Sequence, residues 1–89
     1  MNVRIELIDR KTAELGEALE LFYMYENMDE VEPEVILALI TDLKEKALTL
    51  KYLLEEEIEV RKSANQSIPP KYLEAIEWLS KGFDYLDEI

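Results

Sequence analysis

Cysteine and histidine are both absent from this chain of 89 residues. Their absence excludes disulfides, thiolate or imidazole zinc sites, catalytic triads and cysteine nucleophiles. Glycine and proline are scarce, with two and three residues, whereas Leu, Glu and Lys are abundant, and this balance favours helices over strands or disorder. We therefore expect an all-α protein that is not an enzyme and has no catalytic, cofactor-binding or metal-binding residues.

Long hydrophobic runs are also missing. The longest is VILALI, residues 35–40, which is too short to cross a bilayer. The first ten residues, MNVRIELIDR, have neither the hydrophobic core nor the cleavage site of a signal peptide. We expect a cytoplasmic protein that does not bind membranes.

Positive charge is in deficit, because 21 acidic residues stand against 10 basic ones and give a net charge of −11. Such a chain repels phosphate backbones and anionic lipids, so direct nucleic-acid binding is not expected. From Thr12 to Leu43 there is no Lys or Arg. The same span holds nine acidic residues, namely Glu14, Glu17, Glu20, Glu26, Asp29, Glu30, Glu32, Glu34 and Asp42. One pole of the folded molecule should therefore be strongly negative.

Apolar residues recur three and four positions apart and predict three helices, over about residues 3–28, 33–62 and 70–88. Their main stripes are Ile5, Ile8, Thr12, Leu15, Leu19 and Phe22; then Ile36, Ile40, Leu43, Ala47, Leu50, Leu54 and Ile58; then Tyr72, Ile76, Leu79, Phe83 and Leu86. Pro33 suits a helix start, and SANQSIPP, residues 63–70, reads as a loop before another start. Glu57 and Arg61 stand four apart and are expected to pair on the exposed face of the second helix.

The predicted architecture is a single domain, residues 1–89. A long antiparallel hairpin is formed by the first two helices, and the shorter third helix packs across it like the third member of a three-helix bundle. At 1.5 Å per residue the third helix is about 28 Å long and the second about 45 Å, so the third cannot cover both longer helices. Because small domains often gain missing burial by assembly, we expect a homodimer or a higher homo-oligomer.

The run LFYMY, residues 21–25, points side chains all the way round its helix. One side can pack within the chain, and the other would meet a second copy or another protein. We predict Leu21, Tyr23, Met24, Tyr25 and Met28 as apolar anchors of a partner-binding surface, with Glu26, Asp29 and Glu30 as its charged rim. Alternatively, the third helix folds back over this end and the tyrosines lie along its edge. Trp78, off the main stripe of its helix, is either a second-side core residue or a contact anchor.

These features predict a small acidic helical protein–protein interaction module, such as an adaptor, an inhibitor or a chaperone-like protein, for which a basic protein is one candidate partner. Its acidic surface could instead serve only solubility. A further alternative is a DNA-mimic inhibitor of a nucleic-acid-binding protein, although Lys44, Lys46 and Lys51 interrupt the carboxylate surface that mimicry needs.

The segment KTAELGEALEL, residues 11–21, resembles a helix of the all-α nucleotide pyrophosphohydrolases of the MazG type. The resemblance implies an E-x-x-E metal-binding element at Glu14 and Glu17, which would serve magnesium-dependent hydrolysis. In that family a second helix adds an E-x-x-D pair. Here Asp42 is the matching acid, but Leu39 stands three positions before it, so half of the expected metal site is missing.

Overall fold

A computed structural model describes residues 3–88 as three helices, α1 (Val3–Glu26), α2 (Pro33–Ser63) and α3 (Pro70–Glu88), with no strand among these residues. The prediction of an all-α fold is therefore confirmed. The first helix ends at Glu26, two residues before the predicted end. None of the helices within the described range is long and apolar enough to cross a membrane.

Local sequence explains where α2 begins and ends. Pro33 occupies its first turn, where a missing N–H costs nothing, and Glu34 lies near the positive end of the helix dipole. Asn65 follows the helix in the left-handed conformation, with φ of 55°, which asparagine tolerates better than most residues. The N–H groups of Asn65 and Gln66 donate to the carbonyls of Lys62 and Arg61, at 3.1 and 2.8 Å, and so close the last turn as a Schellman motif.

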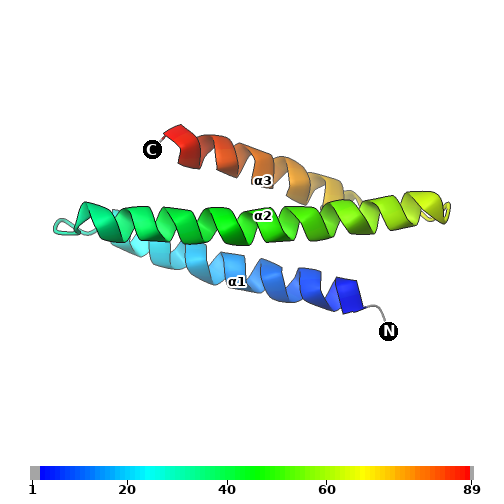
Figure 1. The fold of residues 1–89 in the computed structure, drawn as a ribbon, viewed down its shortest axis with the longest axis horizontal. Helices are drawn as coiled ribbons and strands as arrows, with labels where there is room; N and C mark the ends of the chain where they lie inside the picture. Colours follow the sequence, from blue (N-terminus) through cyan, green and yellow to red (C-terminus); the bar gives the residue numbers. More distant parts are fainter. Residues whose placement is uncertain (1–2, 89) are drawn as a thin grey trace.

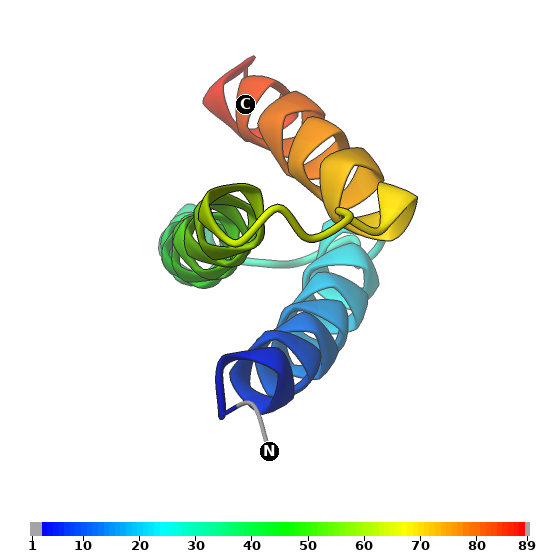
Figure 2. The same ribbon diagram turned by 90° about the vertical axis from the view of Figure 1, so that its right-hand side faces the viewer.

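The central helix is α2, and both other helices pack on it. Figure 1 shows α1 and α3 running in the same direction, opposite to that of α2. The end-on view of Figure 2 places α1 and α3 on the same side of α2. Among the described residues, no Cα atom of α1 lies within 8 Å of one in α3. The three helices therefore pack as two pairs that share α2, α1 with α2 and α2 with α3.

The core follows the predicted stripes. On α2 every predicted position from Ile40 to Ile58 is buried. On α1 Thr12 departs from the prediction, because its side chain is exposed and its hydroxyl donates to the carbonyl of Ile8 at 2.7 Å. The buried apolar residues of the core are Ile8, Leu15, Ala18, Phe22, Ile40, Leu43, Ala47, Leu50, Leu54, Ile58, Tyr72 and Leu79.

The expectation of an exposed Glu57–Arg61 pair is wrong in one respect. The pair forms, with 3.1 Å between Arg61 Nε and Glu57 Oε1, but Glu57 is only 2% exposed. Its second oxygen accepts a hydrogen bond from Arg4 Nη1, also at 3.1 Å, from the start of α1. Sequence spacing within α2 could not reveal the contact between Glu57 and Arg4, because Arg4 is 53 residues away from Glu57.

The molecule is elongated, with extents of 52 × 26 × 16 Å and a radius of gyration of 15.1 Å. A compact chain of this length would have a radius of roughly 12 Å. Its accessible surface is 6387 Å². A typical monomer of 10.5 kDa exposes about 5,400 Å². The fold therefore leaves roughly 1,000 Å² more surface in water than a compact monomer of its mass.

Candidate protein-binding groove

The five side chains of LFYMY have different environments. Phe22 is in the core, at 2% exposure, and Tyr25 is half-buried. Leu21, Tyr23 and Met24 are 42, 53 and 50% exposed. Successive helical residues lie about 100° apart, so one turn mixes inward and outward positions. The chain's own helices therefore enclose one of these five side chains fully and leave three largely open.

Between α1 and α3 lies an apolar hollow of about 230 Å³. We call it the α1–α3 groove and define it by the residues that line it, Leu19, Phe22 and Tyr23 on α1 and Trp78, Lys81, Gly82, Tyr85 and Leu86 on α3. It continues into a smaller hollow of about 40 Å³ that is lined also by Leu43 and Ala47 of α2 and by Leu79. The groove thus has two helical walls and an apolar floor on α2.

Three aromatic side chains stand at the mouth of this groove. Tyr23 is 53% exposed, Trp78 is 54% exposed and Tyr85 is 49% exposed, and all three line the hollow. Trp78 and Tyr85 are seven residues apart and so share one face of α3. Below them, Phe22 and Leu79 are each 2% exposed. The three aromatic side chains are therefore about half exposed to solvent, and the apolar side chains beneath them are buried.

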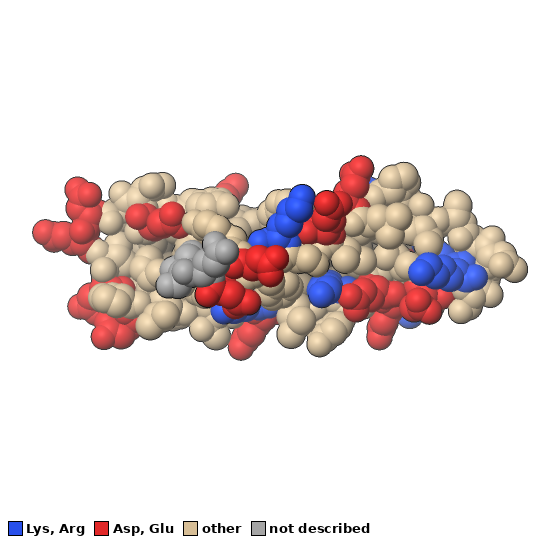
Figure 3. Space-filling view, turned by 90° about the horizontal axis from the view of Figure 1, so that it is seen from above, with Lys and Arg blue, Asp and Glu red and all other residues tan. Residues whose placement is uncertain are grey.

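The two walls differ in charge. On α1, Glu20 and Glu26 lie three residues before and after Tyr23, one helical turn away on either side, and both are exposed. On α3, Lys81 also lines the hollow, and its Nζ is 3.2 Å from Oε1 of Glu77. Figure 3 shows Asp and Glu side chains at the end where α1 joins α2, with Lys and Arg towards the middle and the opposite end. The rim of the groove on α1 therefore carries carboxylates and no Lys or Arg, although neither glutamate lines the hollow itself. The rim on α3 carries both signs, the paired Lys81 and the exposed Asp84.

The predicted anchors do not share one surface. Leu21 and Tyr23 are about 200° apart around α1, and Met24 is about 100° beyond Tyr23. Of the five predicted anchors, only Tyr23 lines the groove. Met28 lies beyond α1 and is 48% exposed, and the rim residues Asp29 and Glu30 are exposed in the same connection. Their role in binding a partner stays a prediction.

The third helix does return to this end of α1, as the alternative interpretation expected, but it covers Tyr23 only in part. For Trp78 the structure favours the contact-anchor interpretation, since its side chain is more than half exposed. Sequence reasoning missed Tyr85. Its spacing of seven from Trp78 was the available signal, because two aromatics on one helix face beside the main stripe mark a second apolar surface.

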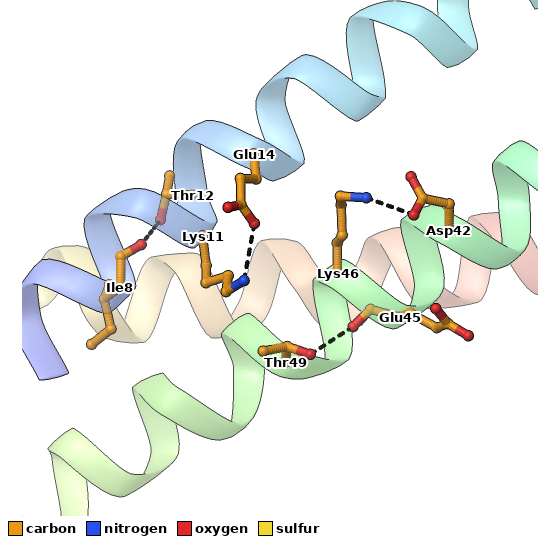
Figure 4. Close-up of polar contacts among 8 residues, drawn as sticks. All are labelled: Ile8, Lys11, Thr12, Glu14, Asp42, Glu45, Lys46 and Thr49. Carbon is orange, nitrogen blue, oxygen red and sulfur yellow. Dashed lines mark hydrogen bonds and ion pairs between the residues drawn. The ribbon is translucent and has the colours of Figure 1, made fainter.

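Two of the three carboxylates considered for the pyrophosphohydrolase resemblance, Glu14 and Asp42, pair with lysines of their own helices. In Figure 4, Glu14 faces Lys11 of its own helix at 3.1 Å, and Asp42 pairs with Lys46 of α2. Glu17 lies one turn along α1 from Glu14 and is exposed. Among the described residues there is no group of three or more acidic side chains placed to hold a metal ion. The metal site that the resemblance implies at Glu14 and Glu17 therefore has no geometric support among the described residues.

Comparison with known protein families, with characterised proteins and with solved structures finds no significant match for this chain.

Proposed function

We propose that this chain is a non-catalytic protein–protein interaction module that holds a protein partner in the α1–α3 groove. The observation that carries the proposal is the group of three half-exposed aromatics, Tyr23, Trp78 and Tyr85, above an apolar hollow. Tyr and Trp are enriched among the residues that contribute most to binding at protein interfaces, because a large exposed ring loses much water contact when a partner covers it.

The amount of exposed surface supports the same proposal. The excess over a compact monomer is roughly 1,000 Å². A standard stable interface buries about 800 Å² on each partner, so the excess surface of the whole molecule is about what one such interface would cover. The antiparallel pair of α1 and α2 serves in this proposal as the scaffold that fixes the floor and one wall.

Charge supports a basic partner. The acidic residues of the α1 wall and of the α1–α2 connection are not neutralised by any Lys or Arg from Thr12 to Leu43 in the sequence. Exposed carboxylates around an apolar centre steer an oppositely charged protein and reject acidic ones. An adaptor or an inhibitor of a basic protein would use the surface in this way.

Site-specific photo-crosslinking in the cells that produce the protein tests the proposal. A photoreactive phenylalanine analogue replaces Tyr85 in the groove or, as a matched control, Leu73, which is 53% exposed on α3 and does not line the groove. We expect one discrete protein adduct from position 85 that is lost when Trp78→Ser is added, and no such adduct from position 73. Identical adducts from both positions, or none from position 85, would overturn the proposal.

A further inference from the structure

We infer that the occupant of the α1–α3 groove is an amphipathic α-helix of the partner, with basic residues on the flank that lies against α1. This inference rests on the proposed function, because it names the kind of segment that the groove would hold. Three features carry it: the shape of the groove, the small residues in its lining and the difference in charge between its walls.

The shape fits a single helix. Both walls are helices that run in the same direction (Figure 1), and α2 closes one side, so a helix added between α1 and α3 would complete a four-helix arrangement. The lining extends from Leu15 to Tyr23 on α1 and from Trp78 to Leu86 on α3. The eight residue-to-residue steps of each span correspond to about 12 Å along each wall. Apolar side chains at positions i, i+4 and i+7 of a bound helix span about 10.5 Å and would fill that length.

Small residues leave room for a side chain of the partner. Gly82 forms part of the α3 wall and Ala47 part of the floor. A methyl group added at Gly82 would meet no atom of a neighbouring element of the described chain within 4 Å. Packed helices insert a side chain of one helix into the space between residues of the other. Gly82 supplies such a space at the centre of the α3 wall.

Charge sets which flank of the bound helix is basic. Glu20 and Glu26 flank Tyr23 on α1, whereas Lys81 of α3 is already paired with Glu77. Lysines or arginines on the flank of the bound helix that faces α1 would therefore make the most favourable electrostatic interactions. A second copy that placed its own groove against this one would be disfavoured, because its Glu20 and Glu26 would approach those of the first.

Trp78 is the only tryptophan of the chain, so its fluorescence reports directly on the groove. The probes are two synthetic peptides of about 18 residues, a length that can form a helix on binding. Both carry leucines at i, i+4 and i+7 and lack Trp; one has lysines along a flank and the other has glutamates there. We expect the lysine peptide to bind, shift Trp78 emission to the blue and become helical by circular dichroism. The glutamate peptide should bind at least about tenfold more weakly.

Matched protein variants separate the effect of the acidic residues beside the groove on α1 from the effect of the net charge of the protein. Glu20→Lys with Glu26→Lys should weaken binding of the lysine peptide about tenfold, as expected for two reversed surface pairs. Glu55→Lys with Glu59→Lys changes the net charge equally at exposed sites outside the groove and should weaken it less than about twofold. Both double variants should keep the wild-type helical content. Gly82→Leu should abolish binding by filling the α3 wall.

The outcomes distinguish this inference from the proposed function. Equal binding of the two peptides, equal losses in the two double variants, or a bound lysine peptide that stays non-helical would each overturn a helical occupant with a basic flank. A discrete crosslink from position 85 alongside any of these results would leave the groove as an interaction site for a different kind of segment. If the crosslink also fails, both proposals fall.

Discussion

The guanidinium of Arg61 lies over the ring of Tyr72, with 5.6 Å between Arg61 Cζ and the ring centroid. The same group donates from Nη1 to the carbonyl of Ser67 at 3.2 Å and from Nε to Glu57 at 3.1 Å. Arg61 therefore joins the end of α2 to the α2–α3 connection and to the first turn of α3. Through Glu57 and Arg4 the network reaches the start of α1.

Removing the carboxylate from this network should destabilise the fold. In Glu57→Ala the cations of Arg4 and Arg61 lose their shared partner. Removing one member of a buried ion pair costs about 3–5 kcal/mol, and we expect about 2–3 kcal/mol here because the two arginine side chains remain 32 and 20% exposed. Urea denaturation followed by circular dichroism measures the loss in free energy of unfolding.

The neighbouring Glu56→Ala is the matched control. Glu56 also pairs with Arg4, at 3.6 Å, but its side chain is 67% exposed. Exposed pairs of this kind contribute about 0.2–1 kcal/mol, so its loss should lie at the low end of that range. Equal losses in Glu56→Ala and Glu57→Ala would show that burial of Glu57 does not matter for stability.

A second prediction concerns the run LFYMY. Phe22→Ala should cost about 3 kcal/mol or more, because it removes a buried ring and leaves a cavity between α1 and the rest of the core. Met24→Ala, two residues along and half exposed, should change the free energy of unfolding by less than about 0.5 kcal/mol. Comparable effects of the two substitutions in urea denaturation would contradict the side-chain positions described above.

The sequence predicted most of the helices because their apolar spacing is regular and their starts are marked. The stripe of α2 is the best case, since every member from Ile40 to Ile58 is buried and Pro33 opens the helix. The position of α3 relative to α1 could not be predicted in this way. That position depends on how α1 and α3 each pack on α2, and no local sequence pattern encodes the distance between α1 and α3.

The candidate site was predicted only in part for the same reason. Tyr23 was named as an anchor and does line the groove, whereas Tyr85 and Gly82 were not named. These residues become neighbours only when α3 returns beside α1, about 60 residues later in the chain. Likewise, in the sequence Glu57 is one of several acidic residues on an apparently solvated helix face. Only the fold brings Arg4 next to it.

Gly16 offers a stabilising substitution. It lies inside α1, it is exposed, and a methyl group added there would meet no neighbouring element of the described chain within 4 Å. Alanine in a helix interior is favoured over glycine by about 0.5–1 kcal/mol, so Gly16→Ala should raise the free energy of unfolding by that amount. Thermal and urea denaturation should both show the gain. A loss of stability would mean that the α1 surface at this position is covered.

Self-association, which the sequence predicts, should depend on salt. The repulsion between copies with a net charge of −11 is screened as the Debye length falls from roughly 30 Å at about 0.01 M to roughly 3 Å at about 1 M ionic strength. Light scattering or sedimentation equilibrium should therefore find a larger dimer fraction at high salt. An association that weakens as salt rises would instead indicate attraction between opposite charges on the two copies.

The surface that we expect to carry this dimer lies on α2. Leu37, Leu48 and Tyr52 are 63, 41 and 58% exposed, and their spacing places them within about 60° of one another around the helix. Leu37→Ser with Tyr52→Ser should therefore abolish dimerisation, whereas Trp78→Ser should leave it unchanged, as judged by sedimentation at high salt. Dissociation by Trp78→Ser instead would place the second copy in the α1–α3 groove. The basic peptide would then compete with the dimer, because a helix and a second copy cannot cover the same aromatic side chains at once.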